Sequence, residues 1–173
     1  MPIARLIGRR PTRADLGLYD ELGNDAAVAR TMGGHRTQEQ LCDALERHLA
    51  AWDRHGFGPS LFFDRETGAF VGRGGLNRVT VLGADEVEVG YALLPTYWGR
   101  GLATEIARAS IATAFDDLGF DSVVGFTLVD NAASRHVLEK CGMSFEREFV
   151  HFDLPHVLLR VRPAGFVNAE PVG

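Results

Sequence analysis

The run from Glu88 to Glu105, EVGYALLPTYWGRGLATE, constrains the fold more than any other part of this chain. Val87 to Leu94 is rich in β-branched, aromatic and aliphatic residues, which predicts a strand. Pro95 ends that strand, because proline has no N–H to donate to a neighbouring strand. Two glycines follow, and Leu102 to Leu118 has the composition of a helix. The run therefore predicts a strand, a glycine-bearing loop and a helix in direct succession.

A loop of this kind can bind an anion. The first N–H groups of a helix have no intrahelical partner, and the helix dipole places partial positive charge there. Gly99 and Gly101 would let the backbone approach an anion closely, and Arg100 could add a charge-assisted contact. On shape alone, an ordinary strand–helix turn explains the run equally well.

Two common nucleotide motifs do not fit this loop. In a Walker A loop the glycines are farther apart and a Lys-Ser/Thr pair opens the helix. A dinucleotide fingerprint needs a third glycine where Thr104 stands.

Two runs of residues resemble a known family. Trp98-Gly99-Arg100-Gly101-Leu102-Ala103 resembles the acyl-CoA-binding signature of the GNAT acetyltransferases, an Arg/Gln-x-x-Gly-x-Gly/Ala loop. With Thr104 and Glu105 it looks most like the RimJ/RimL-like branch, which acetylates the N-termini of ribosomal proteins. Trp98 stands where the wider superfamily usually has Gln or Arg. The run from Asn131 to Met143 resembles the family's Asn-x-x-Ser-x-x-Val-Leu-Glu-Lys-x-Gly-Phe stretch, with Met for the aromatic.

The remaining pattern predicts an α+β fold. Antiparallel strands, a strand–helix–strand unit and a closing hairpin predict a mixed, mostly antiparallel six- to seven-stranded sheet with helices on both faces. The family resemblance implies that this sheet is splayed between strands 4 and 5, with acyl-CoA in the gap. Expected strands are 3–7, 61–64, 69–74, 87–94, 123–129, 145–153 and 156–162, and expected helices are 13–22, 26–32, 37–55, 102–118 and 132–140. We expect a single domain over residues 1–163 and a C-terminal tail over 164–173.

Composition limits the function further. A length of 173 residues favours one domain, and a net charge of −5 argues against non-specific nucleic-acid binding. No apolar run is long enough for a membrane span or a signal peptide, so we expect a cytoplasmic protein without membrane contact. Cys42 and Cys141 have neither disulfide-framework nor metal-ligand spacing, and no metal site is expected.

The resemblance implies acetyl-CoA as cosubstrate. The strand end would pair with the pantetheine amides like an added strand, and the loop would hold the diphosphate. Residues expected to bind the cosubstrate are Leu93, Leu94, Trp98, Gly99, Arg100, Gly101, Leu102, Ala103, Thr104 and Asn131.

Two residues are expected to move protons. In the family the serine equivalent to Ser134 is proposed to protonate the leaving sulfur, and Leu138 stands where many members have a tyrosine. A helix-start hydroxyl that bonds to backbone is the alternative for Ser134. Glu88 is the best candidate base for the amine, directly or through a water, although it could also hold a cationic acceptor or be a solvated strand carboxylate. Glu86 is a weaker rival.

We therefore expect an N-acetyltransferase that moves an acetyl group to a primary amine by direct attack in a ternary complex. The amine is a protein N-terminus or a small molecule. Alternatives are an acyl-CoA-binding sensor without chemistry and an enzyme that detoxifies a small amine or antibiotic. The acceptor would be chosen by loops at 23–34, 56–59 and 79–85 and by the closing hairpin. A homodimer suits this fold, but no sequence feature fixes it.

Overall fold

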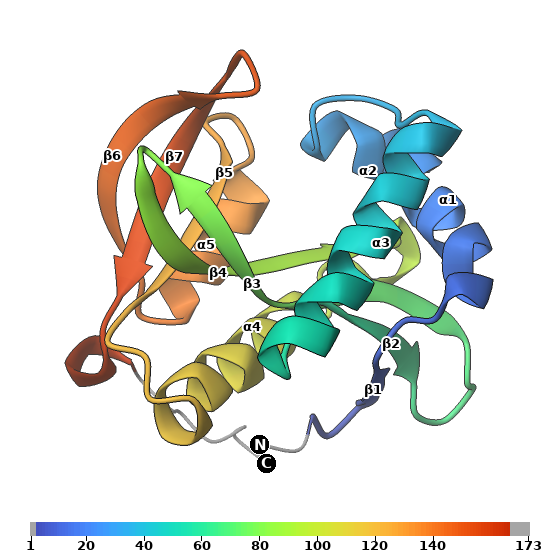
Figure 1. Ribbon diagram of the computed structural model, residues 1–173, viewed down its shortest axis with the longest axis horizontal. Helices are drawn as coiled ribbons and strands as arrows, with labels where there is room; N and C mark the ends of the chain where they lie inside the picture. The colour runs from blue at the N-terminus through green and yellow to red at the C-terminus, as the bar shows by residue number, and fades with distance from the viewer. Residues whose placement is uncertain (1–2, 167–173) are drawn as a thin grey trace.

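The computed structural model of the chain describes residues 3–166 (Figure 1). Its strands are β1 Leu6–Arg9, β2 Ser60–Asp64, β3 Phe70–Val81, β4 Ala84–Leu93, β5 Val123–Leu128, β6 Ser144–His151 and β7 Leu154–Val161. Its helices are α1 Leu16–Asn24, α2 Ala26–Thr31, α3 Gln38–His55, α4 Leu102–Ala112 and α5 Ala132–Lys140. Short 3₁₀ turns lie at Arg13–Asp15, Pro95–Tyr97 and Pro163–Gly165, and a π-helical turn lies at Thr113–Asp117.

The strands form one seven-stranded sheet in the order β1-β2-β3-β4-β5-β7-β6. All neighbours are antiparallel except β4 and β5, which run parallel. The expected mixed sheet is therefore confirmed. The parallel pair shares a single register position, Glu88 with Val124, although β5 continues to Leu128. The sheet is thus splayed between its fourth and fifth strands, as the family resemblance implied.

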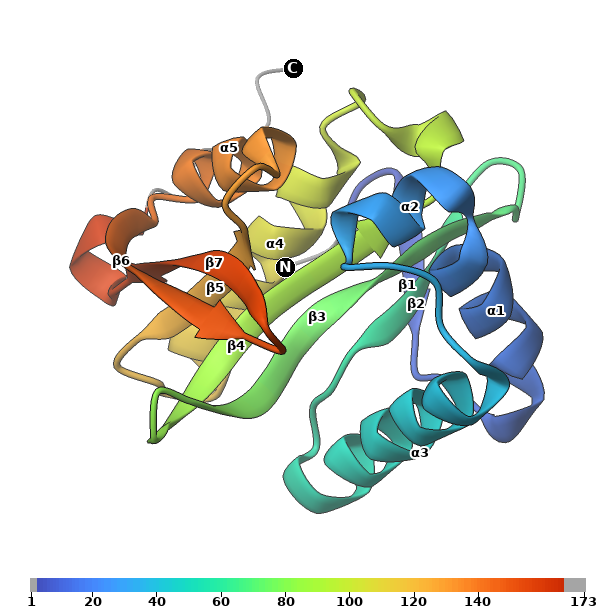
Figure 2. The same ribbon diagram turned by 90° about the horizontal axis from the view of Figure 1, so that it is seen from above.

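The two faces of the sheet carry different helices. Figure 2 shows α4 and α5 on one side of the long β3–β4 pair and α1 and α3 on the other. Val87 and Val89 of β4 pack in one cluster with Ile111 of α4. On the opposite side Tyr19 of α1 packs with Leu61 of β2 and with α3. Because side chains alternate along a strand, Glu88 and Gly90 point toward the α1–α3 side.

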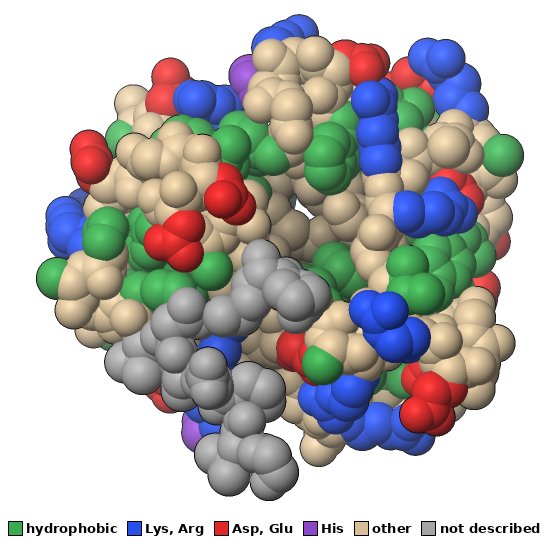
Figure 3. Space-filling model, turned by 90° about the horizontal axis from the view of Figure 1, so that it is seen from below, with side chains coloured by type: hydrophobic (Ala, Val, Ile, Leu, Met, Phe, Trp, Pro, Cys, Tyr) green, Lys and Arg blue, Asp and Glu red, His purple; other side chains and the backbone are tan. Residues whose placement is uncertain are grey.

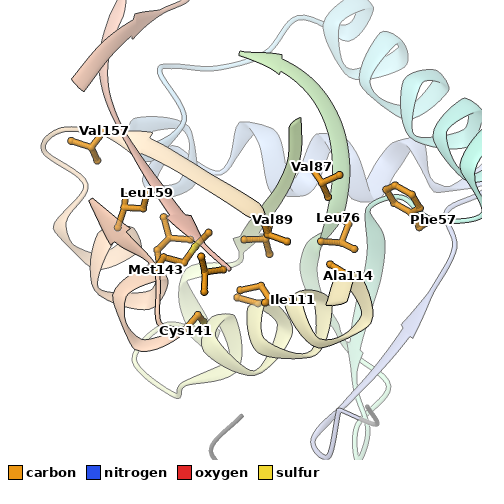
Figure 4. Packing of buried hydrophobic residues seen from close by; sticks show 14 residues of the cluster. Phe57, Leu76, Val87, Val89, Ile111, Ala114, Cys141, Met143, Val157 and Leu159 are labelled. Atoms are coloured by element: carbon orange, nitrogen blue, oxygen red, sulfur yellow. The ribbon is translucent and has the colours of Figure 1, made fainter. Parts of the chain in front are cut away.

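The largest core cluster lies between the sheet and the α4–α5 layer (Figure 4). Val89, Ile111 and Leu159 are at most 2% exposed. Burial of one such side chain contributes about 1.5–3 kcal/mol, so this cluster fixes β4 and β5 against the helices even where the two strands part.

Local sequence signals set the bounds of the longest helix. The Thr37 hydroxyl accepts a hydrogen bond from the Gln40 N–H, and the Gln40 side-chain oxygen accepts one from the Thr37 N–H, which forms a capping box. Gly56 ends the helix in the left-handed region at φ 73°. Leu41 and Leu45 form its buried stripe, as the spacing predicts.

Three expected elements differ in extent. The expected strand 69–74 continues to Val81, because Leu82 and Gly83 form a tight turn at φ 52° and 78° that joins β3 directly to β4. The expected helix 102–118 ends as a regular α-helix at Ala112, since the Leu118 N–H reaches back five residues to the Thr113 carbonyl. The first strand lies at Leu6–Arg9 rather than at 3–7.

The end of the chain was expected to be a tail over 164–173. Within that range the structure describes 164–166, and a 3₁₀ turn lies at Pro163–Gly165. The remaining positions, 167–173, lie outside the described residues.

Candidate active site

The opening between β4 and β5 exposes the edge of β4. The Leu94 N–H donates to the Val71 carbonyl of β3 at 2.9 Å. Backbone groups alternate in direction along a strand, so Tyr91 and Leu93 turn their N–H and C=O groups away from β3 and toward the opening. Beyond Glu88 the described part of β5 supplies no partner for them.

Trp98 closes part of this edge. Its indole Nε1–H donates to the Leu93 carbonyl at 2.7 Å. The Leu94 N–H and the Leu93 carbonyl are therefore both engaged within the protein. The groups of β4 that remain for an added chain are the N–H and C=O of Tyr91 and the N–H of Leu93. Tyr91 was not singled out from the sequence, because only the register of β3 and β4 shows which residues face the opening.

The loop after β4 forms a cradle of N–H groups. Trp98 donates its N–H to the Pro95 carbonyl, and Glu105 donates its N–H to the Gly101 carbonyl. Between them, the N–H groups of residues 99–104 have no acceptor anywhere in the described chain. Gly99 and Gly101 adopt φ 72° and 77°, which turn the loop so that no side chain caps α4. Consecutive free N–H groups at a helix N-terminus suit a diphosphate.

Cationic groups flank this cradle. Arg100 lies over the Tyr97 ring, with its guanidinium 5.5 Å from the ring centroid. Arg5 donates to the Arg100 carbonyl at 2.9 Å and forms an ion pair with Glu105 at 2.9 Å. Arg5 could not be assigned to the loop from the sequence, because it lies far away along the chain and reaches the loop only through the pairing of β1 with the sheet.

Ser134 lies across the opening from β4. The Tyr91 hydroxyl donates to the Ser134 carbonyl at 3.0 Å, and the two hydroxyl oxygens are 3.2 Å apart. The Ser134 N–H donates to the Asn131 Oδ1 at 3.1 Å, so Asn131 caps α5. Burial raises the pKa of the Tyr91 hydroxyl. The structure thus brings Tyr91, Ser134 and Asn131 together at the start of α5.

Glu88 lies on the other face of the same strand. Its carboxylate leans over Gly90, where an added Cβ would lie 3.6 Å from Glu88 Oε1 and meet no other residue. Burial raises the pKa of Glu88 to about 7, and the nearby positive charge of Arg73 opposes this shift. A carboxylate that titrates near neutral pH suits a general base.

The rival Glu86 is engaged elsewhere. Both of its carboxylate oxygens accept hydrogen bonds from the Arg160 guanidinium, at 2.8 and 2.9 Å. Arg160 also binds Glu146. This network anchors β4 to β7 and β6, so Glu86 is an ion-pair residue of the sheet.

Arg73 of β3 lies on the same face as Glu88, opposite Ala92 of β4. Its guanidinium stacks on the Tyr19 ring of α1, 5.0 Å from the centroid. The Tyr19 hydroxyl is 2.7 Å from Nδ1 of His48 on α3. Burial and two nearby arginines lower the pKa of His48 to about 3, so the ring is neutral.

Other reactive side chains do not form a site. Burial raises the pKa of the Cys141 thiol to about 11, which makes it a poor nucleophile. His151 and His156 pack against Phe126 and Phe149, and residues 3–166 contain no group of three potential metal ligands. In the same part of the chain, none of the helices has the length and apolar character needed to cross a membrane.

Figure 3 shows one face of the molecule in space-filling form, and this face is hollowed near its middle. Lys and Arg side chains gather on one half of it. Asp and Glu side chains lie between them on the same half.

Comparison with known proteins agrees with this geometry. The model of a family described as an acetyltransferase (GNAT) domain matches residues 5–144. An FsC-acetyl coenzyme A-N(2)-transacetylase of Aspergillus fumigatus is 39% identical over 72 residues, which are 41% of this chain and 31% of that protein. The chain therefore matches less than a third of that relative. A spermidine N(1)-acetyltransferase of Escherichia coli K12 is 27% identical over 154 residues, 87% of this chain and 80% of that protein.

Among solved structures, an acetyltransferase from Agrobacterium tumefaciens strain C58 superimposes with a TM-score of 0.82 at 25% identity. The superposition covers 94% of this chain and 93% of that one. Three observations indicate the same family: the match of fold, the splayed strand pair, and the family model that covers most of the chain. The chain belongs to the GNAT acetyltransferase family, whose members are enzymes that use acetyl-CoA.

Proposed function

We propose that this protein transfers the acetyl group of acetyl-CoA to a primary amine by direct attack in a ternary complex. The observation that carries the proposal is the run of free N–H groups at residues 99–104, placed directly after a strand whose edge is open. The first feature suits a diphosphate and the second suits the amides of a pantetheine arm. Both features lie on consecutive parts of one chain segment.

The residues expected to hold the cosubstrate keep most of their assigned roles in this proposal. Gly99 to Thr104 supply N–H groups to the diphosphate, and Arg100 adds positive charge. The free backbone groups of the open edge belong to Tyr91 and Leu93. Leu94 contributes no free N–H, because its N–H is bound to the Val71 carbonyl. Trp98 holds the strand end in shape through the Leu93 carbonyl. Asn131 supports the site through its cap on α5.

Glu88 acts as the base on the acceptor side. It accepts one proton from the acceptor ammonium, directly or through a water, and the neutral nitrogen then attacks the thioester carbon. A second proton passes from the nitrogen to solvent water as the carbon–sulfur bond breaks, and the Ser134 hydroxyl recovers from solvent the proton that it gives to the sulfur. The pKa of about 7 leaves much of Glu88 ionised near neutral pH.

Ser134 acts on the sulfur side. Its hydroxyl donates a proton to the leaving thiolate, and the contact with Tyr91 holds it toward the opening. A thiol with a pKa of about 8.5 leaves readily, so this proton contributes modestly to the rate. Tyr91 is a positioning residue in this scheme.

The acceptor is a protein N-terminus or a small amine. The run from Trp98 to Glu105 resembles the RimJ/RimL-like branch, which supports a protein N-terminus. The relative named a spermidine acetyltransferase supports a small amine, at 27% identity over 154 residues. The expected cytoplasmic location and homodimer stay predictions.

One experiment separates an enzyme from a sensor of acyl-CoA. Calorimetry with acetyl-CoA measures binding, and a free-thiol assay against peptides and small amines measures transfer. The proposal expects tight binding and amine-dependent thiol release. Binding without thiol release from any amine would leave a sensor, and absence of binding would refute both.

A further inference from the structure

Arg73 is a partly buried arginine whose guanidinium lies over an aromatic ring and pairs with no carboxylate of the described residues. Within residues 3–166, Arg5, Arg9, Arg10, Arg13 and Arg160 each pair with a carboxylate at 2.9 Å or less. The partly buried Arg73 has no carboxylate within ion-pair distance in that range. Holding a guanidinium away from water without a counterion costs free energy. An arrangement of this kind suits a ligand that brings the negative charge.

The surroundings of Arg73 fix its position. Its guanidinium stacks on Tyr19, whose hydroxyl is held by His48. Tyr19 is only 2% exposed, so the stacking platform is rigid. A stacked guanidinium keeps its planar fork free for a carboxylate or phosphate. The arginine is therefore fixed in place before a ligand arrives.

The charges that face Arg73 come from three elements. Glu88 of β4 is the acidic group close enough to affect the pKa of Arg73, and Arg47 of α3 adds a second positive charge. Tyr19 of α1 and the neutral His48 of α3 add none. Asp15, near Tyr19, is bound by Arg9 at 2.6 Å. The region around Arg73 is thus positive, with a single carboxylate at Glu88.

Arg73 and Glu88 lie on the face where the acceptor is expected. Arg73 is opposite Ala92, four residues along β4 from Glu88, which is about 13 Å at the usual rise of a strand. The Glu88 carboxylate shortens this gap by leaning over Gly90. Gly90 carries no side chain of its own, and a Cβ added there would meet the Glu88 carboxylate alone, at 3.6 Å. The diphosphate cradle belongs to α4, on the opposite face of the sheet.

We propose that Arg73 binds an anionic group of the acceptor, so that the preferred acceptors are amines that also carry a carboxylate or phosphate. This inference rests on the proposed function and names its substrate class. The amine lies at Glu88 and the oxyanion at Arg73, with the connecting chain over Gly90. Polyamines and other polycationic acceptors are poor substrates, because Arg47 and Arg73 repel their additional charges.

The test compares acceptors that differ only in the anion. One series is β-alanine, 4-aminobutanoate and 5-aminopentanoate, and the other is the alkylamines of equal chain length. A further pair, 2-aminoethyl phosphate and ethanolamine, tests whether a phosphate is preferred in place of a carboxylate. Thiol release gives kcat/KM for each. The wild-type protein should prefer the best anionic acceptor over its partner by roughly tenfold or more.

The variants are Arg73→Gln and Arg78→Gln. Arg73→Gln should remove the preference, measured as the ratio of kcat/KM between the two series, with acetyl-CoA binding and melting temperature as folding controls. Arg73 also lowers the pKa of Glu88, so its loss should shift the pH profile upward equally for both series. The ratio of the two series cancels that effect. Arg78→Gln removes a charge from an exposed position of the same strand and should keep the preference.

Three outcomes would overturn the inference. Equal use of both series by the wild-type protein would do so, as would an equal loss for both series in Arg73→Gln. Thiol release with spermidine or peptides, but with neither series, would also refute the anion site while leaving the proposed acetyl transfer intact. If none of the amines tested gives thiol release, the proposed function itself is rejected.

Discussion

Replacing Glu88 by glutamine should stabilise the protein and slow its chemistry at the same time. Burial holds the pKa of Glu88 at about 7, against a usual value of 4.5. In the unfolded chain the carboxyl loses its proton at a lower pH than in the folded protein. Below pH 4.5 this group therefore leaves the free energy of unfolding unchanged. The free energy of unfolding falls as the pH rises from 4.5 toward 7, and it stays lowered above pH 7. Glutamine keeps the shape of the side chain and carries no charge.

The size of the effect follows from the pKa difference. The full shift corresponds to about 3 kcal/mol, nearly all of which is present at pH 8 and about 1 kcal/mol of which is present at pH 5. For a chain of this length, about 3 kcal/mol is a rise in melting temperature of roughly 6–12 °C for Glu88→Gln relative to wild type at pH 8. The gain at pH 5 should be much smaller.

The assays are urea unfolding at the two pH values and thiol release across pH 6–9. Turnover by Glu88→Gln should fall roughly 10²-fold at pH 8, and the rise of kcat/KM near pH 7 should disappear, because the base is gone. Acetyl-CoA affinity should not change, since Glu88 is on the far face of β4. Glu66→Gln, in the exposed turn after β2, is the control and should change neither property.

Three results would refute this reasoning. A stability gain that is equal at pH 5 and pH 8 would show that Glu88 is not held in a desolvated site. A wild-type rate that is constant from pH 6 to 9, or a Glu88→Gln variant with full turnover, would remove Glu88 from the role of base.

Three further substitutions test other parts of the site. Tyr91→Phe removes the hydrogen bond to the Ser134 carbonyl and should lower kcat by up to about tenfold at unchanged acetyl-CoA affinity; a larger loss in affinity than in kcat would contradict its positioning role. Gly101→Ala strains a backbone at φ 77° and should weaken acetyl-CoA binding by about 1–2 kcal/mol in calorimetry, and unaltered affinity would argue against the cradle. Glu86→Gln breaks the pair with Arg160 and should destabilise the protein by about 1–3 kcal/mol in urea while keeping the pH profile, whereas a lost pH dependence would restore Glu86 as the base.

The sequence predicted the elements that depend on local chemistry. Thr37 with Gln40, Gly56 and the run from Leu102 onward each carry a signal within a few residues, and the helices begin or end there. β3 was predicted too short, because Gly72, Gly74 and Gly75 weaken the local strand pattern. Its continuation depends on ten register pairs with β4 that no local pattern shows.

Some residues of the candidate site could be predicted from the sequence, and others needed the structure. Glu88, Ser134 and the loop from Trp98 to Thr104 could be chosen from motifs. Arg5, Arg73 and Tyr91 could not, because their roles arise from strand pairing and from packing between segments far apart in the chain. The sequence already ranked Glu88 above Glu86, and the structure adds that only Glu86 is paired with Arg160 although both face the same side of β4.

The central claim is that the cosubstrate diphosphate lies on the N–H groups of residues 99–104 and that its arm lies along the open edge of β4. A crystal structure of the protein with coenzyme A tests this most directly. The account predicts phosphate oxygens within hydrogen-bond distance of those N–H groups and pantetheine amides opposite Tyr91. A coenzyme A bound elsewhere, or β4 and β5 joined by continuous pairing to Leu93, would contradict it.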